Sequence, residues 1–204
     1  MNAYVFAESK PTYPTSLQIS SLGDSGFFIV RQARIHYASQ PQTHAFNTPY
    51  QLTMKPGIPT GKVPPNRRNS LDDYPEDAAS TSHALHNGDV VVFATDGVSD
   101  NLSSQEILRI VSDEMVIGKG WVSGEGGISP SPLLSAATKG GGDGGGIQAN
   151  VAKAIAVKAK AASVNTKVDG PFAKAVHREA LWEFHGGKQD DICVVCIVVV
   201  EVCF

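Results

Sequence analysis

The most apolar segments of the chain predict its strands. Residues 90–94 are apolar at every position, which is typical of a central strand covered on both faces. Residues 191–202 are also strongly strand-like. Near the N-terminus, three shorter segments at 17–21, 27–31 and 34–38 are separated by short connections, so they predict an antiparallel meander.

Apolar residues recur at helical spacing further along the chain. Residues 101–117 predict a helix whose apolar face comprises Ile107, Leu108, Val111, Met115 and Val116. Ser103 and Glu106 have the spacing of a capping box near its start. Residues 148–162 are rich in alanine and lysine and predict a second helix, and 172–183 a third.

Two segments break these patterns. Residues 55–82 are rich in Pro, Gly, Asn and Asp and predict a loop. In 118–147, eleven of thirty residues are glycine, but the Lys-Ser/Thr end and the preceding strand of a phosphate-binding loop are missing. We therefore expect 118–147 to be a flexible insertion within a single domain spanning 1–204.

Composition narrows the classes of function. The net charge of −3 offers no basic surface, so we expect no nucleic-acid partner. The cysteines, Cys193, Cys196 and Cys203, gather in one strand-like segment, which predicts buried apolar side chains in a reducing, intracellular compartment rather than disulfides. The start of the chain lacks the pattern of a signal peptide, and no apolar run is long enough to span a membrane.

Four aspartates stand at the ends of predicted strands or in the turns beside them. Such positions hold side chains rigidly and leave them open to solvent, and hard divalent cations such as Mg²⁺ and Mn²⁺ prefer oxygen ligands. Carboxylates that converge at one sheet edge repel each other unless a cation lies between them. A single Asp-Gly after a strand is usually only a turn, so the case depends on the surrounding motifs of Asp24, Asp96, Asp100 and Asp190.

Those motifs resemble a known family. Residues 22–27, LGDSGF, resemble the Gly-Asp-Ser motif of the type 2C (PPM) metal-dependent serine/threonine protein phosphatases. Residues 94–101, ATDGVSDN, resemble their Asp-Gly-x-x-Asp motif, and 187–192, GKQDDI, the last motif before the final strand. The pattern QxHxFNxPxQL at 42–52, with PFA at 171–173, is similar to a eukaryotic subgroup often found in mitochondria.

The resemblance implies an α+β fold, a four-layer α-β-β-α sandwich of two antiparallel sheets flanked by helices. It implies two catalytic Mg²⁺ or Mn²⁺ ions that activate a bridging water for in-line attack on the phosphorus of phosphoserine or phosphothreonine in a phosphoprotein. By position, Asp96 and Asp190 resemble ligands of the first metal, and Asp24 and Asp100 ligands of a more weakly held third.

Asp191 and Gly97 then resemble supporting residues of the same motifs. The family motif with the aspartate that bridges both metals, Asp-Gly-x-Gly-Gly, normally lies far upstream of Gly-Asp-Ser. Only 23 residues precede Asp24, and none has that pattern. We therefore expect an N-terminally truncated copy in which the N-terminal strands of the fold are missing.

Three functions follow from this. The first is a metal-dependent phosphatase, mitochondrial by its subgroup or cytoplasmic. The second is a catalytically inactive phosphatase fragment that acts as a binding or regulatory module. The third, an unrelated carboxylate-metal hydrolase, is disfavoured by the pattern at 42–52. His44, His83 and His86 are expected to be structural or solvated, with His83 and His86 in a loop.

Overall fold

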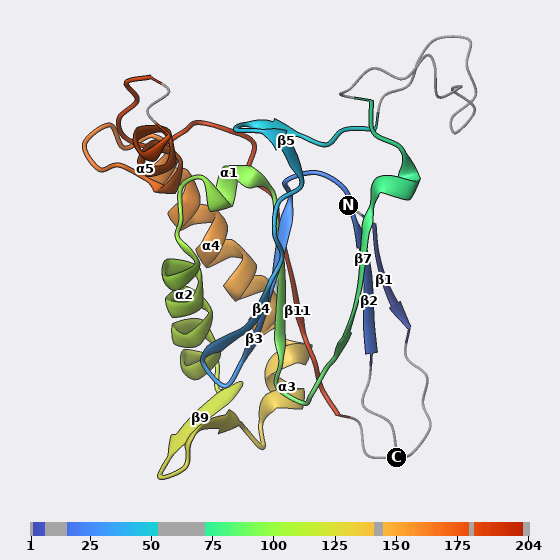
Figure 1. Ribbon diagram of the computed structural model, residues 1–204. Helices are drawn as coiled ribbons and strands as arrows, with labels where there is room; N and C mark the ends of the chain where they lie inside the picture. Colours follow the sequence, from blue (N-terminus) through green and yellow to red (C-terminus); the bar gives the residue numbers. More distant parts are fainter. Residues whose placement is uncertain (1, 7–15, 53–71, 141–144, 180–181, 202–204) are drawn as a thin grey trace. The chain divides into compact units, whose positions relative to one another are not determined.

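A computed structural model describes residues 2–6, 16–52, 72–140, 145–179 and 182–201 (Figure 1). The chain divides into two units. The first comprises Met1–Ser25 and Gln40–Leu85, and the second comprises Gly26–Ser39 and His86–Phe204. Both units contain an antiparallel sheet, and the α-helices all belong to the second among the residues described.

The first unit contains a three-stranded antiparallel sheet, β1(Asn2–Phe6)-β2(Ser16–Ser21)-β7(Ala79–Ala84). In the central strand β2, Leu17 and Ile19 are buried and Gln18 is exposed, so its side chains alternate between the faces as the pleat of a strand requires. Residues 55–71 of the loop predicted for 55–82 lie outside the described residues, and the prediction is wrong at its C-terminal end. There β7 pairs with β2, and a short 3₁₀ helix, η2(Pro75–Asp77), precedes it.

A small hairpin completes the first unit, with strands β5(Thr43–Ala45) and β6(Thr48–Pro49). The buried Asp73 carboxylate lies 3.0 Å from His44 Nε2 and accepts a 2.7 Å hydrogen bond from the Gln51 backbone N–H. The His44 ring stacks on Tyr50. His44 is therefore structural, as predicted, whereas His83 lies in β7 rather than in a loop.

The second unit is built on a four-stranded antiparallel sheet, β11(Val194–Val198)-β8(Val90–Ala94)-β3(Gly26–Arg31)-β4(Arg34–Ala38). Every residue of β8 is buried, which confirms that it is a central strand. The predicted meander is confirmed where β3 and β4 form a hairpin. It does not extend to β2, which pairs with β1 and β7 in the other unit instead.

Two long helices cover this sheet. Helix α2(Ser104–Ile117) packs against α4(Ile147–Ser163), and α4 packs against β11 (Figure 1). Helix α2 begins with the predicted capping box, in which Ser103 and Glu106 bond each other's backbone N–H. The predicted α+β class is confirmed. The core between helices and sheet includes Val90, Val92, Val98, Ile107, Val111, Met115, Val151 and Ile155.

Several boundaries differ from the expectation. A separate short helix, α1(Asp96–Ser99), precedes α2, and α5(Pro171–Arg178) ends before the predicted residue 183. Within 118–147, β9(Trp121–Gly124) and β10(Gly127–Pro130) form a hairpin, followed by α3(Leu134–Lys139). The interpretation of 118–147 as an insertion stays a prediction.

The C-terminal cysteines are less buried than expected. Cys193 is exposed, so the buried interpretation is wrong for it. Cys196 in β11 is half-buried, and burial raises the pKa of its thiol to about 12. Cys203 lies outside the described residues. In the described part of the chain, no helix is both long and apolar enough to cross a membrane.

Candidate functional site

The candidate site lies in the second unit, where β8 ends and α1 begins. Asp96 is the first residue of α1, and Asp100 follows its last residue, with the Asp100 N–H donating to Asp96 O at 2.7 Å. Residues four apart on a helical turn lie on the same face, so this turn directs both carboxylates to one side. The sequence Asp-Gly-x-x-Asp is therefore the spacing of a single helical turn.

The segment before β11 approaches this turn closely. Thr95 Oγ1 donates to Asp191 O at 2.8 Å and accepts from the Cys193 N–H at 3.0 Å. A Cβ atom on Gly97 would lie 2.5 Å from Asp191 O and 3.2 Å from Asp190 Cβ. The absence of a side chain at Gly97 is thus what allows the backbone beside Asp190 to reach α1.

Asn101 joins the same two segments from the other side. Its buried amide donates to Gly97 O at 2.8 Å and to Lys188 O at 2.7 Å, and its oxygen accepts from the Lys188 N–H at 2.9 Å. Every polar atom of the Asn101 side chain is used in these bonds. This clamp fixes the backbone of Lys188 relative to α1.

The hydrogen bonds of Asn101 and the close contact at Gly97 bring three carboxylates together. One carboxylate oxygen from each of Asp96, Asp100 and Asp190 lies within 4.8 Å of the others. The ammonium of Lys188 lies between them, with Nζ 2.6 Å from Asp100, 3.2 Å from Asp190 and 3.4 Å from Asp96. Lys188 Nζ also lies 4.7 Å from the centroid of the Phe172 ring.

Burial and the charge of Lys188 shift the pKa values in the cluster. Burial raises the pKa of Asp100 above its ordinary value, and the hydrogen bond from Lys188 only partly offsets it. The pKa of Asp190 is lowered, first by the hydrogen bond from the Asp191 N–H and further by Lys188. Burial by itself lowers the pKa of Lys188, but its hydrogen bond to Asp100 and the nearby carboxylates outweigh burial and raise it.

The structure therefore brings together three of the four predicted aspartates. Asp24 is half-buried in the turn between β2 and β3 and belongs to the first unit, so its place among the ligands stays a prediction. The Gly23 carbonyl of that turn accepts a hydrogen bond from the Gln42 N–H at 2.9 Å. Asp191 is an exposed residue that contacts the site through its backbone.

Two residues of the site were not predicted. Lys188 is the single cation in the motif GGKQDD, and that isolated charge next to Asp190 was an available signal. Asn101 closes the motif ATDGVSDN, but an asparagine after a helical turn gives no sign of a partner 87 positions away. Lys188 and Asn101 act together, since the amide of one fixes the backbone of the other.

The chain is similar to curated proteins over most of its length. The chain is 34% identical to the Drosophila simulans protein phosphatase PTC7 homolog fig, over 88% of this chain and 47% of that protein. It is also 34% identical to the 5-azacytidine resistance protein azr1 of Schizosaccharomyces pombe, over 88% of this chain and 50% of that protein. The chain thus spans about half the length of the curated relatives it matches. No family model matches it.

The fold has a counterpart among solved structures. The X-ray structure of the photosystem II phosphatase PBCP superimposes with a TM-score of 0.63 at 24% identity, over 90% of this chain and 59% of that one. The same family is indicated by the three sequence motifs in order, by the similar proteins and by this shared fold. The chain belongs to the type 2C (PPM) family of protein phosphatases, and the Drosophila relative is named as a PTC7 homolog.

Proposed function

We propose that this chain carries the acidic half of the active site of a metal-dependent protein serine/threonine phosphatase. The observation that carries the proposal is the convergence of Asp96, Asp100 and Asp190 on one point in a chain of this family. The substrate class is a phosphoprotein bearing phosphoserine or phosphothreonine. We propose a mitochondrial location because the pattern at 42–52 resembles the mitochondrial subgroup, with the cytoplasm as the alternative.

The residues present suit a hard divalent cation. Three carboxylates and one ammonium leave the cluster with a formal charge of −2, which attracts a divalent cation. Carboxylate oxygens, with water in the remaining positions, are the ligands that Mg²⁺ and Mn²⁺ prefer. Asp96 and Asp190 would hold a catalytic ion and Asp100 a further, weaker one, for which Asp24 is a ligand predicted from the sequence motif alone. When bound, such ions act as Lewis acids toward a phosphoryl group.

Lys188 has a distinct part in this site. With no metal bound, its ammonium neutralises part of the charge of Asp96, Asp100 and Asp190 and holds the three side chains together. A divalent cation at the same point would be repelled by the ammonium or would displace it. Lys188 therefore keeps the cluster preorganised and at the same time competes with the metal.

Hydrolysis of a phosphothreonine peptide by the full chain with Mn²⁺ tests the proposal. We expect activity that a chelator abolishes and that Asp96→Asn lowers strongly, because the substitution removes a charged ligand while conserving the shape of the side chain. Calorimetry should show weaker Mn²⁺ binding by the same variant. Metal binding without hydrolysis would favour the inactive binding module, and Mn²⁺ affinity unchanged by Asp96→Asn would exclude Asp96 as a ligand.

A further inference from the structure

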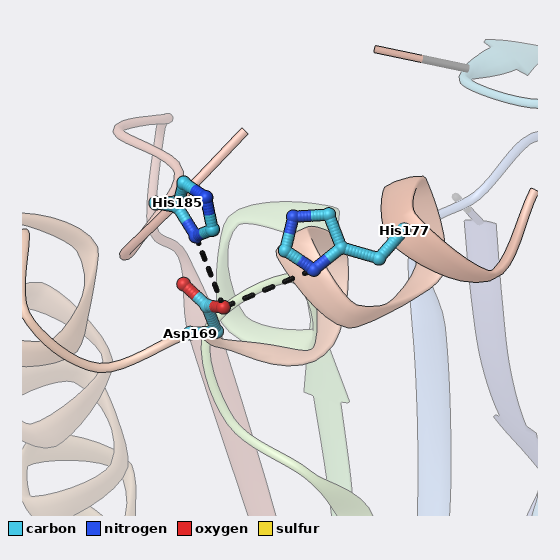
Figure 2. Close-up of side chains that lie close together, drawn as sticks. All are labelled: Asp169, His177 and His185. Atoms are coloured by element: carbon cyan, nitrogen blue, oxygen red, sulfur yellow. Dashed lines mark hydrogen bonds and ion pairs between the residues drawn. The ribbon is translucent and has the colours of Figure 1, made fainter. Parts of the chain in front are cut away.

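A second cluster of metal-ligating side chains lies in the second unit, formed by Asp169, His177 and His185 (Figure 2). Asp169 precedes the start of α5, His177 lies in its last turn, and His185 lies in the segment that leads to Lys188. Asp169 Oδ2 is 3.3 Å from His185 Nδ1 and 3.9 Å from His177 Nδ1. The two imidazoles thus direct the same ring nitrogen at the same oxygen.

The backbone holds Asp169 in this position. Its other carboxylate oxygen, Oδ1, accepts a 2.7 Å hydrogen bond from the Gly186 N–H, which leaves Oδ2 to face the histidines. That bond is the main reason that the pKa of Asp169 is lowered. Gly186 has φ of +84°, and a Cβ there would lie 2.7 Å from Asn165 O. Only glycine at 186 therefore allows the backbone N–H to reach Asp169. This hydrogen bond holds the Asp169 carboxylate in place, as hydrogen bonds do for carboxylates that bind metals.

The donor set differs in kind from that of the acidic cluster. Two imidazole nitrogens and one carboxylate oxygen suit Zn²⁺ and related transition metals rather than Mg²⁺. Ligands at the usual Zn²⁺ distances of about 2.0–2.1 Å lie about 3.3 Å apart in a tetrahedron. The Asp169–His185 separation of 3.3 Å already has this value. The His177 side chain is 38% exposed and that of His185 69% exposed, so both have room to close the remaining distance.

We propose that Asp169, His177 and His185 form a Zn²⁺ site, distinct from the carboxylate cluster and independent of the proposed phosphatase activity. A three-ligand site leaves a fourth position for water. Bound Zn²⁺ would join the C-terminal end of α5 to the segment that carries Lys188 and Asp190. Without metal, the same three residues form only a surface network of one carboxylate and two histidines.

Calorimetric titration of the metal-free full chain with Zn²⁺ tests this site. We expect one Zn²⁺ to bind in Asp96→Asn protein, in which the acidic cluster is weakened. In that background His177→Ala and His185→Ala should each lower the Zn²⁺ affinity by at least the roughly tenfold to hundredfold that the loss of a hydrogen-bond partner behind a metal ligand causes. His36→Ala is the matched control, because His36 is an exposed histidine on β4 outside the cluster, and it should leave the affinity unchanged.

Two further measurements identify the ligands directly. Long-range ¹H–¹⁵N spectra of the imidazoles should show Zn²⁺ acting on the Nδ1 atoms of His177 and His185. Zn²⁺ should also raise the thermal unfolding midpoint of the Asp96→Asn protein and not that of the same protein with His185→Ala added. Zn²⁺ binding that survives both histidine substitutions, that is lost in His36→Ala, or that does not occur would overturn the proposal.

Discussion

Lys188→Met separates the two parts that we assign to Lys188. The substitution removes the ammonium that lies among Asp96, Asp100 and Asp190 but keeps an unbranched apolar stem of similar length beside Phe172. If the ammonium competes with a divalent cation, its removal should strengthen metal binding. If it acts only as structural support for the carboxylates, its removal should loosen the cluster and weaken binding.

The distances set the magnitude. Lys188 Nζ lies 2.6 to 3.4 Å from the three carboxylates, and at about 3 Å one pair of unit charges is worth about 1.4 kcal/mol at the dielectric of water and about 5.5 kcal/mol at an effective dielectric of 20. The four side chains are between 18% and 34% exposed, so solvent screening favours the lower value. A cation that displaces one such pair loses about tenfold in affinity. We therefore expect Lys188→Met to bind Mn²⁺ about tenfold more tightly, or more.

Calorimetric titration with Mn²⁺ measures this directly. Lys188→Arg keeps the charge and should retain the weaker affinity. Lys174→Met, on the exposed face of α5, is the matched control for the loss of a lysine and should change the affinity little. An affinity for Mn²⁺ that is unchanged or lower in Lys188→Met would refute the competition.

Three further predictions concern the second unit, each checked by chemical denaturation. Asp89→Ala should cost about 3–5 kcal/mol of unfolding free energy, because buried Asp89 accepts two 2.7 Å bonds from Arg31 and a 2.8 Å bond from the His86 N–H, and the substitution breaks this ion pair, whereas Glu201→Ala at an exposed position should cost little. Trp121→Phe should cost about 1–3 kcal/mol, since the buried indole N–H donates to Gly88 O, and an equal stability would show that water replaces the bond. Hydrogen bonds from Ser103 lower the pKa of Glu106, so the charged carboxylate stabilises the fold fully above its ordinary pKa of 4.5, and this stabilisation is lost as the pH falls through the lower pKa of the folded state. The difference in unfolding free energy between the parent and Glu106→Gln should therefore narrow in acid, and a difference independent of pH would contradict this.

The sequence predicted the strands whose own apolar residues indicate that they are buried. β8 is apolar at each position, and its place at the centre of a sheet follows from that alone. β7, with the sequence ASTSHA, carries no such signal and becomes a strand by pairing with β2. Its preceding residues have a loop-like composition, so tertiary pairing overrode local preference.

In the site too, local sequence predicted some residues, and tertiary packing determined the others. The sequence placed Asp96 and Asp100 in the turn after a strand, and the family motif added Asp190. The helical turn α1, which directs both carboxylates to one side, was not predicted. The position of Lys188 could not be predicted, because its partner Asp100 is 88 residues away and the bond depends on how two segments meet. Local patterns locate the carboxylates, and long-range packing decides which charge balances them.

That packing depends on the least reactive residues of the motifs. Gly97 admits the backbone of Asp191, Thr95 bonds that backbone, and Asn101 fixes Lys188. None of these three needs to touch a substrate, yet each determines where a carboxylate or the ammonium lies. A side chain at Gly97 would separate Asp190 from Asp96 and Asp100 without removing any carboxylate. The motif residues between the aspartates therefore carry the geometry of the site, and the aspartates carry its charge.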